Sequence, residues 1–152
     1  MKVDLHVHAS ERSGCSQLPQ ETQIQEAIRL GLDGLAFTDH NKLISLAEVQ
    51  RLTRQYAPFK IYRGIERTCN GEDIVILGVE DPAIETVAHD DYAGLHAFVR
   101  AQGGFMFLAH PFRYHPEIRV DLAGYPPDGI EVASVSTPAA DEEQIRQLAA
   151  EH

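Results

Sequence analysis

Hydrophobic and polar positions follow two patterns that take turns along the chain. Short apolar or β-branched runs predict strands at residues 2–7, 33–38, 59–65, 73–79, 105–109 and 129–133. Apolar residues spaced three or four apart predict helices at residues 20–30, 45–56, 92–102 and 138–151. We expect irregular chain at residues 80–91 and 113–127. Strands that alternate with helices predict an α/β fold, with helices packed outside a parallel sheet.

Side chains that can bind metal follow four of the predicted strands at their carboxyl ends. They are His6 and His8, then Asp39 and His40, then Glu66, and then His110. Because the carboxyl ends of parallel strands lie on one face of an α/β protein, we expect these side chains to converge. Imidazole and carboxylate together suit zinc, manganese and iron. The pattern therefore predicts a site for divalent metal ions on that face.

The first predicted strand carries the densest part of this pattern, Asp4-x-His6-x-His8. Side chains alternate between the two faces of a strand, so these three are expected to point the same way. Two neutral imidazoles can share a cation, and Asp4 is placed to accept a hydrogen bond from one ring and orient it. A His-x-His pair alone also arises by chance in a polar segment. The three other strand ends are what favour a metal site.

Composition and charge narrow the classes of protein. The 152 residues, 43% of them hydrophobic, suit a single domain over residues 1–152. A formal net charge of −10 argues against a surface for nucleic acid or an anionic membrane, and no apolar run has the length of a membrane span. Cys15 and Cys69 lack the spacing of a thiolate zinc site, and we expect both to be small core or loop residues. A cytoplasmic protein fits this cysteine usage.

Four segments, DLHVHAS, GLDGLAFTDHN, GIE and FMFLAHPFRY, resemble in this order the first motifs of the PHP (polymerase and histidinol phosphatase) domain family. The loop SGCS at residues 13–16 resembles that of small stand-alone metal-dependent phosphoesterases in the family. The resemblance implies a distorted (βα)7 barrel with two or three divalent metal ions.

The same resemblance implies roles for individual residues. His6 and His8 are expected to bind one metal ion, Glu66 to bridge two, and His40 to hold another. His110 is expected to lie on the metal cluster. Asp39, like Asp4, is expected to support the ligands without binding metal.

The reaction implied is hydrolysis of a phosphoester in a small phosphorylated metabolite or nucleotide, with a metal-activated water as nucleophile. Arg113, soon after His110, is a candidate phosphate clamp, and a solvated loop arginine is the equal alternative. Catalysis is expected to depend on His6, His8, Glu66, His110 and Arg113. Two alternatives stay open: an amidohydrolase-like metal hydrolase, and a degenerate, non-catalytic module that binds metal or a partner. Nothing in the sequence indicates an oligomeric state.

Two features depart from the family pattern. Many members have an acidic residue or a histidine a few positions after His-x-His, where this chain has Glu11, Ser13 and Cys15. The family also closes its site with a Ser-Asp-x-His-type motif on a late strand, and no such motif occurs here. We therefore expect a barrel that is incomplete at its C-terminus. Either the natural chain continues beyond residue 152, which we favour, or the site functions without that motif.

Overall fold

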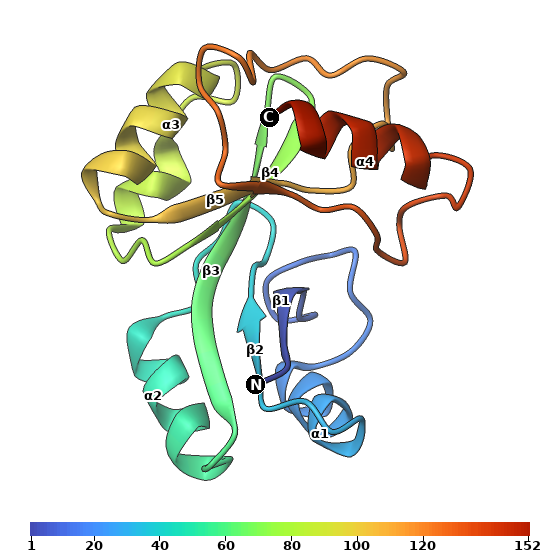
Figure 1. Ribbon diagram of the computed structural model, residues 1–152. Coiled ribbons are helices and arrows are strands. Elements are labelled where there is room, and N and C mark those ends of the chain that lie inside the picture. The colour runs from blue at the N-terminus through green and yellow to red at the C-terminus, as the bar shows by residue number, and fades with distance from the viewer. The chain divides into compact units, whose positions relative to one another are not determined.

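The computed structural model describes residues 1–152 as two compact units, Met1–Glu66 and Arg67–His152. Each unit combines strands and helices, which confirms the α/β fold class (Figure 1). No helix is both long and apolar enough to cross a membrane.

The first unit is built on three parallel strands. They are β1 (Val3–Val7), β2 (Gly34–Phe37) and the first part of β3 (Lys60–Cys69), and α1 (Gln20–Arg29) and α2 (Leu46–Gln55) lie between them in the chain. Asp4 on β1 stands opposite Leu35 on β2, and Leu35 stands opposite Ile61 on β3. Gly34 lies at a close approach of β2 to β3, where a Cβ atom would stand 2.6 Å from the Lys60 carbonyl oxygen.

One hydrophobic cluster holds the three strands and two helices of this unit together. Its fully enclosed members include Ile24 from α1, Leu35 and Phe37 from β2, and Leu52 from α2. Burial of such side chains stabilises each by roughly 1.5–3 kcal/mol. The unit therefore has a core of its own, and the carboxyl ends of its strands are set by that core.

The second unit holds the remaining strands. They are β4 (Glu72–Leu77), β5 (Phe105–Leu108) and β6 (Gly129–Ile130), accompanied by the 3₁₀ helix η1 (Pro82–Thr86) and by α3 (Tyr92–Ala101) and α4 (Glu142–Glu151). Strand β4 is buried along most of its length, and Leu95 and Val99 of α3 are buried as well. The 3₁₀ helix falls within residues 80–91, where the sequence predicts irregular chain.

The prediction of a wholly parallel sheet is wrong in the second unit. Strands β4 and β5 run antiparallel, with Ile74 opposite Leu108, whereas β5 and β6 run parallel. The reversal follows a turn at Asn70 and Gly71, whose φ angles of 53° and 87° suit a two-residue hairpin connection. The six strands of the chain are also fewer than the seven that the family resemblance implies.

Helix α2 begins at a side-chain cap, and this feature can be tested. Ser45 Oγ accepts a hydrogen bond of 3.2 Å from the Glu48 backbone N–H. We expect Ser45→Ala to lower the free energy of unfolding by about 1 kcal/mol, because one N–H at the helix start loses its partner. Urea unfolding followed by circular dichroism measures the change. Ser45→Asp is the control and retains stability; an unchanged midpoint in Ser45→Ala contradicts the prediction.

Candidate metal centre

The buried carboxylate of Glu66 lies among three imidazole rings. Its Oε1 atom is 3.1 Å from His6 Nε2, and its Oε2 atom is 3.0 Å from His8 Nε2 and 2.9 Å from His40 Nδ1. The Glu66 side chain has no exposed surface, whereas those of His6 and His8 are 15% exposed and that of His40 is 33% exposed. Both carboxylate oxygens therefore face imidazole nitrogens. The carboxylate is buried, whereas the three rings are partly exposed to solvent.

Backbone pairing between the strands places these four side chains. His6 lies on β1 and His8 directly follows it. Beyond the end of β2, His40 and Glu66 form an isolated parallel bridge, in which the Asn41 N–H donates to the Glu66 carbonyl oxygen at 2.8 Å. The register of three parallel strands therefore decides that residues from three distant segments meet.

His8 Nε2 is the atom that best tests whether this cluster suits a metal ion. It is buried and forms no hydrogen bond, although it stands only 3.0 Å from Glu66 Oε2. The two atoms are close but not aligned for a proton to link them. A buried polar atom without a hydrogen bond is costly, and a cation between an imidazole nitrogen and a carboxylate oxygen removes that cost. The donor set of three imidazoles and one carboxylate also matches the ligand preference of zinc, manganese and iron.

Asp39 holds the start of the loop at residues 10–19 through hydrogen bonds, next to His8 and His40. Its buried carboxylate accepts hydrogen bonds from the Ala9 N–H at 2.7 Å, from Arg12 Nε at 2.6 Å and from Ser13 Oγ at 3.0 Å. Ser13 Oγ in turn accepts a hydrogen bond of 2.9 Å from the His40 N–H. Asp39 therefore supports the backbone next to His8 and His40, as a residue outside the ligand set would.

Asp4 has a different partner from the one expected. Its Oδ1 accepts a hydrogen bond of 3.1 Å from the backbone N–H of His6, and the side chain is exposed. The carboxylate thus fixes the strand at His6 and does not orient an imidazole ring through this contact.

Cys15 is the residue of this unit that sequence reasoning missed. Its Sγ atom lies 3.0 Å from His8 Nδ1, and Cys15, His8 and His40 can each offer one ligand atom within 4.8 Å of the others. The available signal was its position in the loop after His-x-His, where the family pattern has an acidic residue or a histidine. Cysteine spacing alone could not reveal it, because the groups near its sulfur are histidines and not cysteines.

His110 and Arg113 belong to the second unit. The buried His110 ring has its Nε2 atom 3.8 Å from Asp73 Oδ2, and its backbone N–H donates to Glu131 Oε2 at 2.9 Å. The residue adopts a φ angle of 29°, which is uncommon outside glycine. Arg113 is exposed, and its guanidinium carbon lies 5.1 Å from the centre of the Tyr114 ring.

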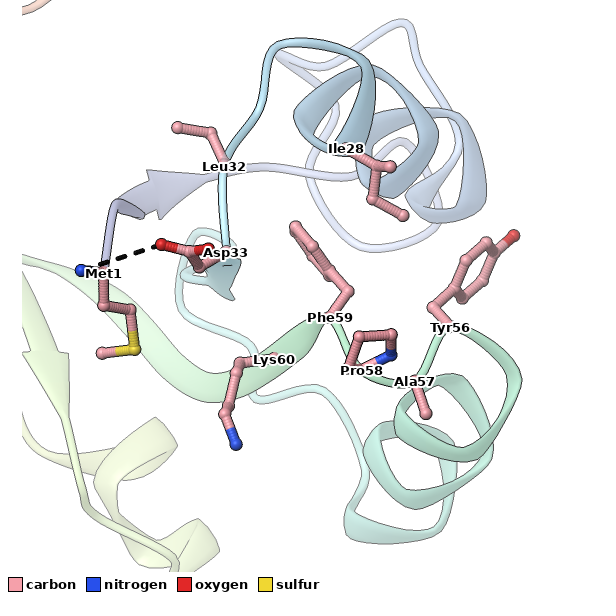
Figure 2. Close-up of a pocket in the computed structure, with 9 residues that line it drawn as sticks. All are labelled: Met1, Ile28, Leu32, Asp33, Tyr56, Ala57, Pro58, Phe59 and Lys60. Carbon is pink, nitrogen blue, oxygen red and sulfur yellow. Dashed lines mark ion pairs between the residues drawn. The ribbon is translucent and has the colours of Figure 1, made fainter.

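A cavity of about 660 Å³ lies at the other end of the strands of the first unit. Figure 2 shows Ile28, Tyr56 and Phe59 around it, with Asp33 and Lys60 where β2 and β3 begin. Its lining is mainly apolar and holds one carboxylate and no imidazole. Ligands of parallel α/β proteins gather at the carboxyl ends of strands, so the cluster around Glu66, and not this cavity, is the candidate site.

A family model of the PHP domain matches residues 4–143 of the sequence. The chain belongs to the PHP domain family. No protein of curated function matches the sequence. Membership confirms the resemblance seen in the motifs around His6, His40, Glu66 and His110.

Solved structures share the fold of this PHP chain. A protein from Bifidobacterium adolescentis, proposed to be a metal-dependent phosphoesterase, has 14% identity and a TM-score of 0.76, over 100% of this chain and 84% of that one. A two-domain protein from Bacteroides vulgatus contains a predicted PHP-like metal-dependent phosphoesterase; it has 21% identity and a TM-score of 0.65, over 87% of this chain and 44% of that one. An amidohydrolase from Chromobacterium violaceum, solved with sulfate and no metal, has 20% identity and a TM-score of 0.69, over 100% of this chain and 84% of that one. These likenesses confirm the PHP-type barrel as the fold class.

Asp39→Asn tests the fastening of the loop. The substitution leaves the Arg12 guanidinium, whose side chain is only 13% exposed, without its anionic partner. We expect the free energy of unfolding to fall by about 3 kcal/mol, because an uncompensated buried charge is costly. Urea unfolding measures the change, and Asp90→Asn at an exposed carboxylate is the control. Equal stability of the two variants contradicts the prediction.

Proposed function

We propose that this PHP domain is a metal-dependent phosphoesterase that hydrolyses a small phosphorylated metabolite or a nucleotide. The observation that carries the proposal is the buried Glu66 carboxylate with imidazole nitrogens 2.9–3.1 Å from its two oxygens. Family membership and the names of structural relatives support a hydrolase of this class.

Under this proposal His6, His8, His40 and Glu66 would hold the metal ions, and two of the ions would share Glu66. His110 is proposed as a further ligand from the second unit, held by its contacts with Asp73 and Glu131. Asp39 holds the loop and the His40 backbone in place. Zinc, manganese and iron all suit these residues, and two or three ions are expected.

Bound divalent cations would supply a water of lowered pKa and would neutralise the oxygens of a phosphoryl group. The chain contributes the positions of the ligands, and the Glu66 carboxylate among them is fully buried. With a net charge of −10 on the chain, bound cations would offset the overall repulsion of an anionic substrate. A cytoplasmic location and a small-molecule partner remain predictions from the sequence.

The double variant His6→Ala with His8→Ala tests the metal centre. We expect it to lose bound metal and to hydrolyse an aryl phosphate at background rate, because two of the nitrogens around Glu66 are gone. Metal content by mass spectrometry and the rate with added manganese or zinc measure the two effects. His89→Ala, at an exposed imidazole, is the control and keeps both.

The outcomes separate the candidate functions. Stoichiometric metal in the double variant contradicts the ligand assignment. Metal without turnover in the native chain, on aryl phosphates and nucleotides alike, favours the non-catalytic module. Turnover of an amide or lactam substrate and not of phosphoesters favours an amidohydrolase.

Arg113→Ala tests the proposed phosphate clamp. Loss of a charged, forked hydrogen-bond donor is expected to raise KM for a phosphate monoester about 10-fold, with a smaller effect on kcat. Steady-state kinetics measure the split, and Arg54→Ala on α2 is the control for loss of an exposed arginine. An unchanged KM in Arg113→Ala identifies Arg113 as a solvated loop residue.

A further inference from the structure

The sulfur of Cys15 lies where a further metal ligand would be useful. It stands 3.0 Å from His8 Nδ1, the ring nitrogen that does not face Glu66. Ligand atoms of Cys15, His8 and His40 all lie within 4.8 Å of one another. Two imidazoles and a thiolate are a donor set that zinc binds readily.

We propose that Cys15 binds a divalent cation through its sulfur, in company with His8 and His40. The inference rests on the proposed metal centre and deepens it, because it adds a binding position on the Nδ1 side of His8, whose Nε2 atom faces Glu66. If both ring nitrogens hold cations, His8 does so as imidazolate, having given up its ring proton to solvent. In this chain the cysteine serves in the loop where the family pattern has an acidic residue or a histidine.

Hydrogen bonds hold the backbone of the loop that carries Cys15, so the fold keeps this residue beside His8. Ser13, two residues earlier, is buried and links Asp39 Oδ1 to the His40 N–H. The Ser16 N–H donates to the Ser13 carbonyl oxygen at 3.1 Å, and the Ser10 N–H donates to the Leu18 carbonyl oxygen at 2.9 Å. The same network that supports His40 therefore also holds the backbone on both sides of Cys15.

The separation of Cys15 Sγ from His8 Nδ1 suits coordination after a small adjustment. Zinc binds nitrogen at about 2.0–2.1 Å and sulfur at about 2.3 Å, which places two tetrahedral ligands about 3.5 Å apart. The observed separation of 3.0 Å is shorter by about half an ångström. The Cys15 side chain is exposed, so the sulfur can make this adjustment without disturbing a packed neighbour.

A role as a mere hydrogen-bond partner of His8 explains less of the arrangement. Histidine ligands usually donate their second N–H to a carboxylate, a carbonyl or water, and such a partner needs to reach one ring only. Cys15 has ligand atoms of two different imidazoles in range. Thiolate ligands favour zinc and cobalt over manganese and magnesium, so Cys15 would also narrow the choice of metal.

Cobalt(II) is the probe for the experiment, because a thiolate bound to cobalt gives an intense near-ultraviolet charge-transfer band. The metal-free 152-residue chain is titrated with cobalt without oxygen. We expect the band in the native chain and in Cys69→Ser, which removes the buried cysteine of the other unit. We expect its loss in Cys15→Ser and in Cys15→Asp, with cobalt still bound to Cys15→Asp.

Thiol reactivity gives a second readout that needs no activity. In Cys69→Ser the only remaining thiol is that of Cys15, and we expect zinc to slow its reaction with a disulfide reagent at least about 10-fold. Zinc affinity of Cys15→Ser is expected to fall by at least about 10-fold. Equal reaction rates with and without zinc would overturn the inference.

The results distinguish this inference from the proposed function. If the native chain binds cobalt but gives only weak visible bands, the sulfur is not a ligand and this inference is overturned. The proposed metal centre at Glu66 is then still supported. A band that survives in Cys15→Ser also overturns the inference. No cobalt binding by the native chain overturns both proposals together.

Discussion

The interaction on which the rest depends is the burial of one carboxylate, that of Glu66, among three imidazole rings. A carboxylate with no exposed surface is stable only if other groups compensate its charge. Here the nitrogens within 3.1 Å come from β1, from the segment after it and from the segment after β2. The parallel register of β1, β2 and β3, and the bridge between His40 and Glu66, are therefore requirements of the site as well as of the sheet.

A second buried carboxylate, that of Asp39, differs from Glu66 in what compensates its charge. Its partners are an arginine, a hydroxyl group and a backbone N–H, all hydrogen-bond donors, so its charge is compensated within the protein. Arg12 also lies over the Phe37 ring at 5.3 Å, which joins the clamp to the hydrophobic core. The two neighbouring acids thus differ in function because one is surrounded by donors and the other by atoms that can share a cation.

The two ends of the strands in the first unit differ in the chemistry of the side chains around them. Past the carboxyl ends of β1 and β2 lie His8, His40 and the exposed sulfur of Cys15, and there the interior of β3 brings in Glu66. The amino ends border a cavity walled largely by aliphatic and aromatic side chains (Figure 2). An α/β unit separates these properties because the loops that follow the carboxyl ends of the strands carry polar groups. Polar groups in those loops do not disturb the packed core.

The sequence by itself determined the α/β class, the PHP family and the convergence of His6, His8, His40 and Glu66. The fold class and the convergence follow from local periodicity and from the rule that parallel strands end at one face, and the family follows from four short motifs. All of these are encoded in short stretches of chain. The tertiary structure decided the antiparallel pairing of β4 with β5, the partner of Asp4 and the approach of Cys15 to His8 and His40. Each of these depends on how a turn or a loop directs the chain. The bond from the His40 N–H to Ser13 Oγ joins residues 27 positions apart, a distance over which hydrophobic patterns carry no information.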